Sequence, residues 1–339
     1  MVYHDLSFYI EYGKLFHILA VFFIFIYKPI NQLISRGISI KLQTIFMLNY
    51  FLRVSYSLFL LSLISLFNPV FGQNSPKLII RSDDIGSFNA ANRAIIETYK
   101  NGITTSVELM VNCPWAVEAV KMLEENLNLD VGVHLMITSE WENCKWRPLT
   151  PAKSIVDEYG NFFSFIYPNK DVPNASIQEH PWKLEDIEKE FRAQIELARK
   201  MIPRISHIST HMGSGNWDPQ VKKMVEKLSK EYNLPQDQDY IFEMFPNLDL
   251  KSKASVEDKI IAFLAALDEL KDGKTYLFVE HPGLDVSEME NVGHEGYRNV
   301  REDRSDVTKI LLDPRIKEKI QNLGIQLVDF KSLKPNVNW

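Results

Sequence analysis

The sequence predicts a parallel α/β protein in which strands and helices alternate. Short apolar runs with strand character alternate about six or seven times with amphipathic helical stretches. That order is typical of barrels and of open parallel sheets, and the pattern alone leaves both open. The chain has neither an internal repeat nor a glycine-rich phosphate-binding loop.

The elements follow from periodicity and from local start and stop signals. Gly102 ends one helix, Pro114 lies in the first turn of the next, and Asp218 with Pro219 caps a third. The expected strands, which share short apolar runs, are 78–81, 104–112, 130–135, 204–211, 240–244, 275–280 and 325–330. The expected helices, which share apolar residues at spacings of three and four, are 89–101, 114–126, 184–202, 218–230, 255–270 and 314–322.

Two segments break this alternation. Residues 141–181 are rich in Trp, Pro, Asn and Phe and have no period, which is typical of a functional loop or lid. Residues 293–304 (GHEGYRNVREDR) are polar and are expected to form a solvated loop, although His294, Tyr297 and Arg298 could also contact a substrate.

The first 72 residues are more hydrophobic than the rest of the chain. Residues 47–72 have the layout of a secretory signal peptide: a Met, one positive charge, an apolar run and a cleavage site after Gly72. We therefore expect 1–46 to be an over-extended start and 73–339 to be one secreted or periplasmic domain with an inserted loop at 141–181. The alternative is a protein anchored in the membrane through its N-terminal segment.

Composition excludes some partners. The formal net charge is −6 over 339 residues and no basic patch is present, so nucleic acid is not an expected partner. We expect no stable membrane span in the mature chain. Cys113 and Cys144 lack the spacing of a metal site. They could form a disulfide or remain buried thiols, and we expect no functional role for them.

Acidic and imidazole side chains end four of the apolar runs. The carboxyl ends of parallel strands form the rim on which α/β active sites are built, so these groups are expected to share one metal or acid–base site. One carboxylate with two imidazoles leaves positions open for water and substrate. A second carboxylate could accept a proton from that water, and another histidine could protonate a leaving group. The residues are Asp83, Asp84, His134, His207, His211 and His281.

The motifs RSDDIG, VGVHL, SHISTH and EHPG, in this order and spacing, resemble the YdjC/ChbG-type carbohydrate deacetylases, within the wider NodB-like group. The resemblance covers about residues 78–333. It implies a distorted (β/α) barrel, one divalent metal ion (Mg²⁺ or Zn²⁺) and hydrolysis of an N-acetyl group from a small carbohydrate. Family members are often dimers, so a homodimer is also an expectation.

The resemblance also implies roles for individual residues. Asp84, His134 and His211 correspond to the metal ligands, Asp83 to the catalytic base, and His281 to the general acid or a group beside the oxyanion. His207 corresponds to a position behind the ligands.

The chain departs from the family pattern in two places. Relatives tend to have CHPG where this chain has EHPG, and Gly213 stands where a further histidine is common. The aromatic loop adds candidate substrate contacts, together with Tyr297 from the polar segment; those of the loop are Trp141, Trp146, Arg147 and the neighbouring Trp182. A loop that only packs on the domain is an equally good interpretation of those tryptophans.

The leading interpretation is a metal-dependent hydrolase that removes N-acetyl groups from an amino sugar or oligosaccharide. The same open metal site would also serve an esterase or a phosphoesterase. A non-catalytic glycan-binding protein is the third alternative, and the paired aspartates and the histidines argue against it.

Overall fold

The computed structural model describes residues 49–50, 53–54, 74–248 and 254–337. The chain divides into two compact units, Met1–Val70 and Phe71–Trp339, and only the second carries the fold discussed below. The predicted signal peptide lies almost entirely outside the described residues. Within the described residues, no helix is long and apolar enough to cross a membrane.

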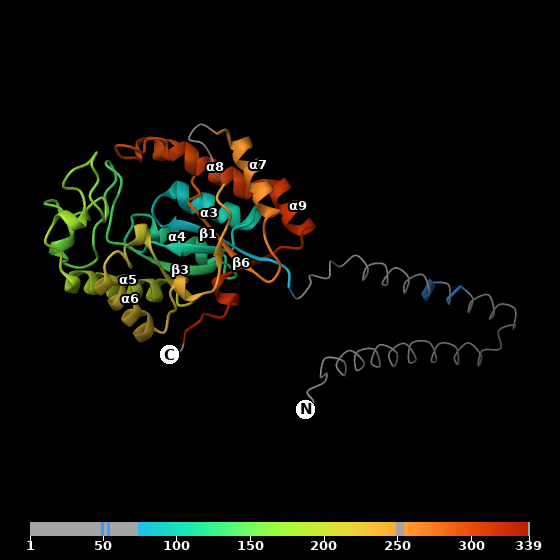
Figure 1. Ribbon diagram of the computed structural model, residues 1–339, viewed down its shortest axis with the longest axis horizontal. Helices are drawn as coiled ribbons and strands as arrows, with labels where there is room; N and C mark the ends of the chain where they lie inside the picture. The colour runs from blue at the N-terminus through green and yellow to red at the C-terminus, as the bar shows by residue number, and fades with distance from the viewer. Residues whose placement is uncertain (1–48, 51–52, 55–73, 249–253, 338–339) are drawn as a thin grey trace, which may run out of the picture. The chain divides into compact units, whose positions relative to one another are not determined.

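A seven-stranded parallel sheet forms the centre of the second unit (Figure 1). Its strand order is β4-β3-β2-β1-β6-β5, and β7 pairs with the amino-terminal half of β1. The sheet curls into a half-barrel, which confirms the predicted parallel α/β class. The strands are β1 (Lys77–Ile85), β2 (Ser106–Leu109), β3 (Asp130–Leu135), β4 (His207–Thr210), β5 (Glu243–Met244), β6 (Thr275–Glu280) and β7 (Gln326–Val328).

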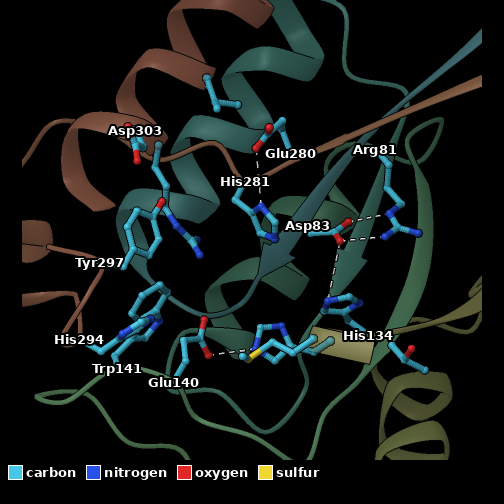
Figure 2. A pocket seen from close by; sticks show the side chains of 15 residues that line it. Arg81, Asp83, His134, Glu140, Trp141, Glu280, His281, His294, Tyr297 and Asp303 are labelled. Carbon is cyan, nitrogen blue, oxygen red and sulfur yellow. Dashed lines mark hydrogen bonds and ion pairs between the residues drawn. The ribbon is translucent and has the colours of Figure 1, made fainter. Parts of the chain in front are cut away.

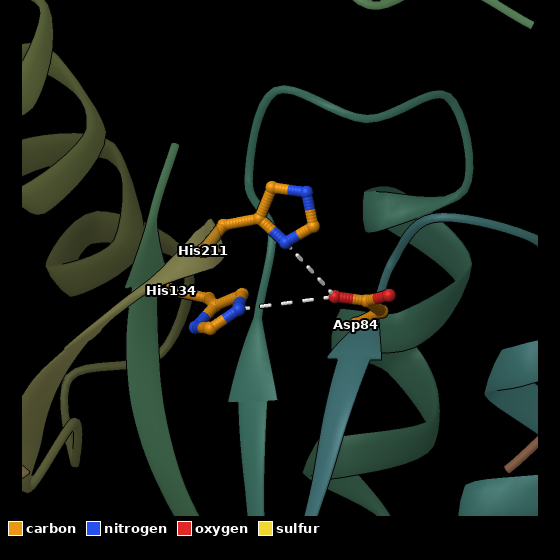
Figure 3. A group of neighbouring side chains, drawn as sticks. All are labelled: Asp84, His134 and His211. Carbon is orange, nitrogen blue, oxygen red and sulfur yellow. Dashed lines mark ion pairs between the residues drawn. The ribbon is translucent and has the colours of Figure 1, made fainter. Parts of the chain in front are cut away.

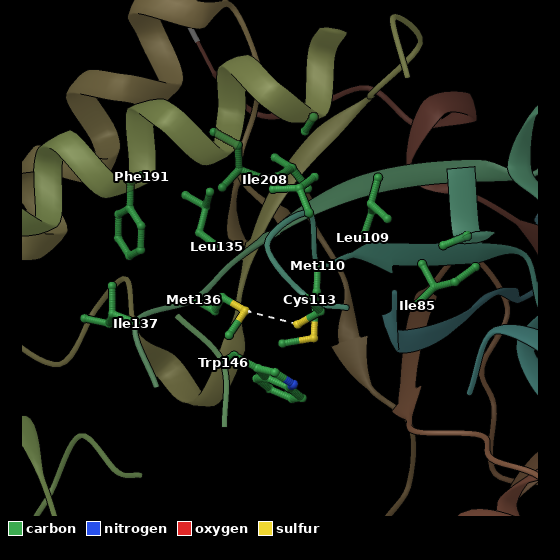
Figure 4. Close-up of a cluster of buried hydrophobic side chains, with 14 of the residues drawn as sticks. Ile85, Leu109, Met110, Cys113, Leu135, Met136, Ile137, Trp146, Phe191 and Ile208 are labelled. Carbon is green, nitrogen blue, oxygen red and sulfur yellow. Dashed lines mark hydrogen bonds between the residues drawn. The ribbon is translucent and has the colours of Figure 1, made fainter. Parts of the chain in front are cut away.

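Helices cover the outer side of the curled sheet in two groups (Figure 1). Leu78 and Ile80 of β1 pack with apolar residues of the last three helices. Ile208 of β4, with apolar residues of β2 and β3, packs against the first four, and Figure 4 shows part of this larger cluster around Trp146. The helices are α3 (Asn89–Asn101), α4 (Ala116–Glu124), α5 (Leu184–Met201), α6 (Pro219–Tyr232), α7 (Val256–Leu267), α8 (Val300–Leu312) and α9 (Pro314–Asn322).

The inner side of the sheet changes from apolar to polar along β1. Because strand side chains alternate between faces, Ile79, Arg81 and Asp83 of β1 share the inner face. Ile79 packs on Phe330 in a small apolar cluster, whereas Arg81 and Asp83 form a buried ion pair. The carboxyl end of the half-barrel is therefore lined by charged groups.

Several expected boundaries were wrong. The first strand continues through both aspartates to Ile85, whereas we expected it to end before them. The segment 293–304 is not a loop throughout, because α8 begins at Val300. The polar residues 301–303 obscured an amphipathic helix whose buried side begins with Val300 and Arg304.

The inserted segment 141–181 packs closely on the domain. Trp141 and Trp146 are buried in the main apolar cluster, together with Phe162 and Ile177. The packing interpretation therefore holds for most of its aromatic residues.

Both cysteines are free thiols, Cys113 buried and Cys144 half-buried. The sequence left open a disulfide or two unbonded thiols, and the structure has two unbonded thiols.

Candidate metal and acid–base site

The two aspartates face one pocket because the backbone of β1 is irregular there. The pairing of β1 with β2 shifts register between Ser82 and Ile85, as a β-bulge does. Asp84 has a φ of 69°, a left-handed conformation that aspartate tolerates better than most residues. The irregular backbone breaks the alternation of side chains, so Asp83 and Asp84 both reach the carboxyl end of the sheet.

Asp84, His134 and His211 converge at this end (Figure 3), and one ligand atom from each lies within 4.8 Å of the others. Asp84 Oδ1 is 3.8 Å from His134 Nε2 and 3.5 Å from His211 Nδ1. This oxygen is buried and has no hydrogen-bond partner among the described residues. An unpaired buried carboxylate oxygen is costly, and a cation held between these three atoms would satisfy it.

Charged neighbours keep Asp84 ionised. Burial alone would raise the pKa of this carboxyl, but His281, Arg304 and His211 together hold it well below its ordinary value. The negative charge required for metal ligation is therefore present over the whole neutral range.

A buried chain of hydrogen bonds orients His134. Its Nδ1 lies 2.7 Å from Ser209 Oγ, and Ser209 donates its hydroxyl proton to Glu108 Oε2 in a short hydrogen bond. Glu108 Oε1 lies 2.8 Å from His207 Nε2. Since the Ser209 proton is used on Glu108, His134 must donate from Nδ1, which leaves the Nε2 lone pair facing Asp84. The chain thus selects the tautomer that can bind a metal.

Gly132 makes space for this chain. A Cβ at this position would lie 2.3 Å from Glu108 Oε2 and 2.6 Å from His207 Nε2. Any residue with a side chain at position 132 would push the buried Glu108–His207 pair aside.

A carboxylate also orients His211. Its Nε2 lies 3.0 Å from Glu140 Oε2, so Nδ1 faces Asp84. Burial lowers the pKa of His211, but Glu140 and Asp84 outweigh it and raise the pKa to about 10. Burial and the charge on His211 instead hold the pKa of His134 well below its ordinary value. Binding of a cation requires neutral rings and would release the His211 proton.

Asp83 lies beside the ligands without belonging to the triad. Arg81 holds both of its oxygens, with Nε–Oδ1 at 2.8 Å and Nη2–Oδ2 at 3.0 Å. The third Arg81 nitrogen, Nη1, binds Asp237 at 2.7 Å. Burial raises the pKa of Asp83 to about 6, although Arg81 opposes the shift. A carboxylate with such a pKa is suited to accept a proton near neutrality.

His281 follows β6 and lines the pocket across from the ligands (Figure 2). Burial lowers its pKa, but the charge of Asp84 outweighs this and the pKa is raised above its ordinary value. This shift favours the protonated form of His281, which is the form that can donate a proton.

Arg304 of α8 is the main site residue that the sequence interpretation missed. Its Nη2 lies 2.8 Å from Asp84 Oδ2, its side chain is buried, and its guanidinium carbon lies 5.5 Å from the centre of the Trp141 ring. Nη1 is buried and has no partner among the described residues. The only sequence signal was that Arg304 lies four residues after Val300, the spacing of one helical face. We had assigned this segment to a loop.

Helix α8 also holds the turn after His281. The Gly283 amide donates to Arg304 O at 3.1 Å and to Thr308 Oγ1 at 3.0 Å. The helix that contacts Asp84 therefore also positions His281.

These groups surround a pocket of about 480 Å³, within the usual range for small-molecule sites. Of the predicted residues, Asp83, His134, His211, His281 and Tyr297 line it (Figure 2). Three of the weaker candidates lie elsewhere. His207 is buried beneath His134, Trp146 packs edge-on against the His211 ring at 6.1 Å, and the exposed Arg147 binds Asn161. Trp141 of the aromatic loop and His294 of the polar segment, both candidates from the sequence, also line the pocket. Glu140 and Arg304 are lining residues that we did not predict.

This fold and site define the class of protein. A curled parallel sheet that carries a carboxylate–imidazole triad, a second carboxylate and a further histidine at its carboxyl edge is the arrangement of a hydrolytic enzyme built on a parallel α/β fold.

Comparison with known proteins identifies the family. The model of the family "YdjC-like protein" matches residues 77–322, and the chain belongs to this family. The resemblance inferred from the four motifs is thereby confirmed.

Relatives match over most of the chain. A carbohydrate deacetylase of Clostridium beijerinckii is 30% identical over 275 residues, covering 76% of this chain and 100% of that protein. A carbohydrate deacetylase of Geobacillus stearothermophilus is 26% identical, covering 75% and 96% respectively. Among solved structures, a putative cellobiose-phosphate cleavage protein of Enterococcus faecalis matches with a TM-score of 0.62 and 25% identity, over 77% of this chain and 99% of that one.

Proposed function

We propose that this protein is a metal-dependent carbohydrate deacetylase that hydrolyses the N-acetyl group of an amino sugar. The observation that carries the proposal is the unpaired Asp84 Oδ1 facing two imidazole nitrogens, with Asp83 beside them. The names of the relatives support the same reaction.

Asp84, His134 and His211 would hold the divalent ion. When bound, such an ion polarises the acetyl carbonyl and lowers the pKa of a water molecule. Two imidazoles and one carboxylate suit Zn²⁺ better than Mg²⁺, which prefers oxygen ligands.

In this mechanism Asp83 takes a proton from the attacking water, and the water oxygen forms a bond to the acetyl carbon. Arg81 fixes the orientation of the Asp83 carboxylate through two hydrogen bonds. His281 then donates a proton to the sugar nitrogen as the C–N bond breaks. The products are acetate and the free amine.

Acetate release tests the proposal. The full-length protein would be stripped with a chelator, refilled separately with Zn²⁺, Mg²⁺, Mn²⁺ or Co²⁺, and supplied with N-acetylated sugars. We expect one or more metals to restore acetate release, and Asp83→Asn to abolish it while the metal stays bound. Acetate release that is independent of metal would overturn the proposed cofactor. Bound metal without acetate from any sugar would favour an esterase or a phosphoesterase.

We also propose that residues 47–72 direct export and are removed after Gly72. The apolar run and the small residues before the cleavage site support this. N-terminal sequencing of the protein from its native host checks it, and a mature chain that does not start near Gln73 would contradict it.

A further inference from the structure

Two carboxylates hold all three nitrogens of the Arg81 guanidinium. Nε and Nη2 donate to Asp83 Oδ1 and Oδ2 at 2.8 and 3.0 Å (Figure 2), and Nη1 donates to Asp237 Oδ2 at 2.7 Å. The Arg81 side chain is only 9% exposed, so water competes little for these bonds. Each corner of the planar group is therefore fixed by a charged acceptor.

Asp237 is presented by a short 3₁₀ helix, η4 (Asp237–Asp239), which is tied to two other parts of the fold. The amide of Ile208 in β4 donates to Pro235 O, just before this helix, at 2.8 Å. The amide of Asn336 donates to the carbonyl of the last helical residue at 2.7 Å. The amide of the next residue also donates to Asp237 Oδ1 at 2.7 Å, so both oxygens of this carboxylate are held.

The contact with Asp237 adds a constraint that Arg81 and Asp83 lack by themselves. These two residues lie two positions apart on β1, and their two parallel bonds fix only the orientation of one group relative to the other. The pair can still swing as a unit about its own strand. A third bond, to a carboxylate carried by a different segment, prevents that swing. It thereby fixes Asp83 Oδ2 at its place 3.9 Å from His134 Nε2.

Asp237 does not line the catalytic pocket, whereas Arg81 and Asp83 do. Any influence of Asp237 on the reaction must therefore pass through Arg81. Proton transfer is sensitive to such support, because a displacement of about 1 Å in a reacting group can lower the rate about a hundredfold.

We infer that Asp237 is a positioning residue for the proton-transfer step: acting through Arg81, it holds the Asp83 carboxylate in the orientation that accepts the proton of the attacking water. The inference rests on the proposed deacetylase function, and it adds a residue that none of the sequence motifs contains.

Steady-state kinetics of the full-length, metal-loaded protein test the inference on the sugar that yields acetate. Asp237→Asn keeps the shape of the side chain and removes its charge. We expect kcat to fall about three- to tenfold, the effect of one weakened hydrogen bond, while KM and metal content stay unchanged. Asp237→Glu keeps the charge and should lose less. Asp272→Asn, the same exchange at an exposed position in the turn before β6, should change none of these values.

A double-mutant cycle separates action through Arg81 from a general loss of structure. Arg81→Lys keeps the positive charge but cannot bridge two carboxylates with three nitrogens. Adding Asp237→Asn to Arg81→Lys should therefore lower kcat by less than it does in the wild-type background.

A second measurement is independent of turnover. In the metal-free protein labelled with [15N]arginine, the Arg81 Nε proton is bonded to Asp83, so its exchange with solvent reports on that contact and not on the bond to Asp237. We expect Asp237→Asn to accelerate this exchange about threefold or more, and Asp272→Asn to leave it unchanged. The Arg81→Lys protein identifies the signal by its absence.

The outcomes separate this inference from the proposed function. If acetate is released but Asp237→Asn leaves kcat unchanged, or lowers it equally in the Arg81→Lys background, the inference is overturned and the deacetylase function stands. If no sugar yields acetate, the proposed function fails and the exchange of the Arg81 Nε proton decides. Faster exchange in Asp237→Asn would sustain the hold of Asp237 on Asp83, and unchanged exchange would overturn it.

Discussion

Replacing Gly132 with alanine tests whether the buried chain behind His134 depends on the missing side chain. The backbone itself can accept alanine, because Gly132 is not among the residues with positive φ. The new Cβ, however, would lie 2.3 Å from Glu108 Oε2 and 2.6 Å from His207 Nε2. Both side chains are fully buried, so the 2.8 Å contact between them must open.

Three effects set the expected magnitude. Overpacking a closed interior costs about 1–3 kcal/mol, and the loss of a hydrogen bond to a charged group adds about 1.5–3 kcal/mol. Alanine regains about 0.5–1 kcal/mol over glycine in a strand. We therefore expect Gly132→Ala to lower the free energy of unfolding by about 2–5 kcal/mol.

Urea unfolding of the metal-free protein measures this change. Gly160→Ala is the matched control, because a Cβ there would meet nothing within 4 Å, and its left-handed backbone should cost only about 1–2 kcal/mol. Adding Glu108→Ala should make the effects of the two exchanges less than additive, since it removes the shorter of the two clashes and gives the His207 ring room to move. A Gly132→Ala protein as stable as the wild type would refute the reasoning.

Four further predictions concern the site. Asp83→Asn should lower kcat by about 10²–10⁴-fold while metal content, measured by atomic absorption, stays near wild type; loss of the metal would contradict the role of base. Because burial raises the pKa of Asp83 from 3.8 to about 6, the native state favours the protonated form. The contribution of Asp83 to the free energy of unfolding should therefore decline as pH rises from about 3.8 to about 6. The value of kcat/KM should fall as pH drops below the pKa of Asp83, because the base becomes protonated. A bound cation should move this fall in kcat/KM to lower pH. Ser209→Ala should weaken metal binding about 10–100-fold by releasing the His134 tautomer, and an unchanged dissociation constant in a competition titration would argue against the chain. Arg304→Met should destabilise the metal-free protein by about 3–5 kcal/mol, because it leaves the Asp84 charge buried and less compensated. Thermal unfolding measures this loss. In the double variant Arg304→Met/Asp84→Asn the loss should be smaller, because the buried charge is absent.

Much of the site could be predicted because its groups follow recognisable strands. The rule that parallel strands place their carboxyl ends at one edge brought Asp84, His134 and His211 together correctly, although they are up to 127 positions apart in sequence. The expected strand 130–135 and the helix cap at Asp218 also match the structure.

The remaining features depend on tertiary contacts that no local pattern encodes. Glu108 lies within an ordinary strand, and its carboxylate reaches Ser209 and His207 because Gly132, which lies between Glu108 and His207 in the register of the sheet, has no side chain. Arg304 looks like a surface charge in sequence, because its neighbours are polar. Its burial results from the packing of α8 against α3 and α7, with Arg304 reaching Asp84 at the end of β1, which periodicity in a mixed segment did not reveal.

Helix α8 contacts both Asp84, a proposed metal ligand, and the turn after His281, the proposed proton donor, so one rigid helix supports both groups. Arg304 and Thr308 lie one turn apart, so a tilt of the helix would move the carboxylate support and the His281 turn at once. The apolar residues that anchor α8, such as Ile310 and Leu311, do not line the pocket and pack against the neighbouring helices and strands. Directed evolution of this protein should therefore find variants of altered turnover among these packing residues, without any change to a residue that lines the pocket.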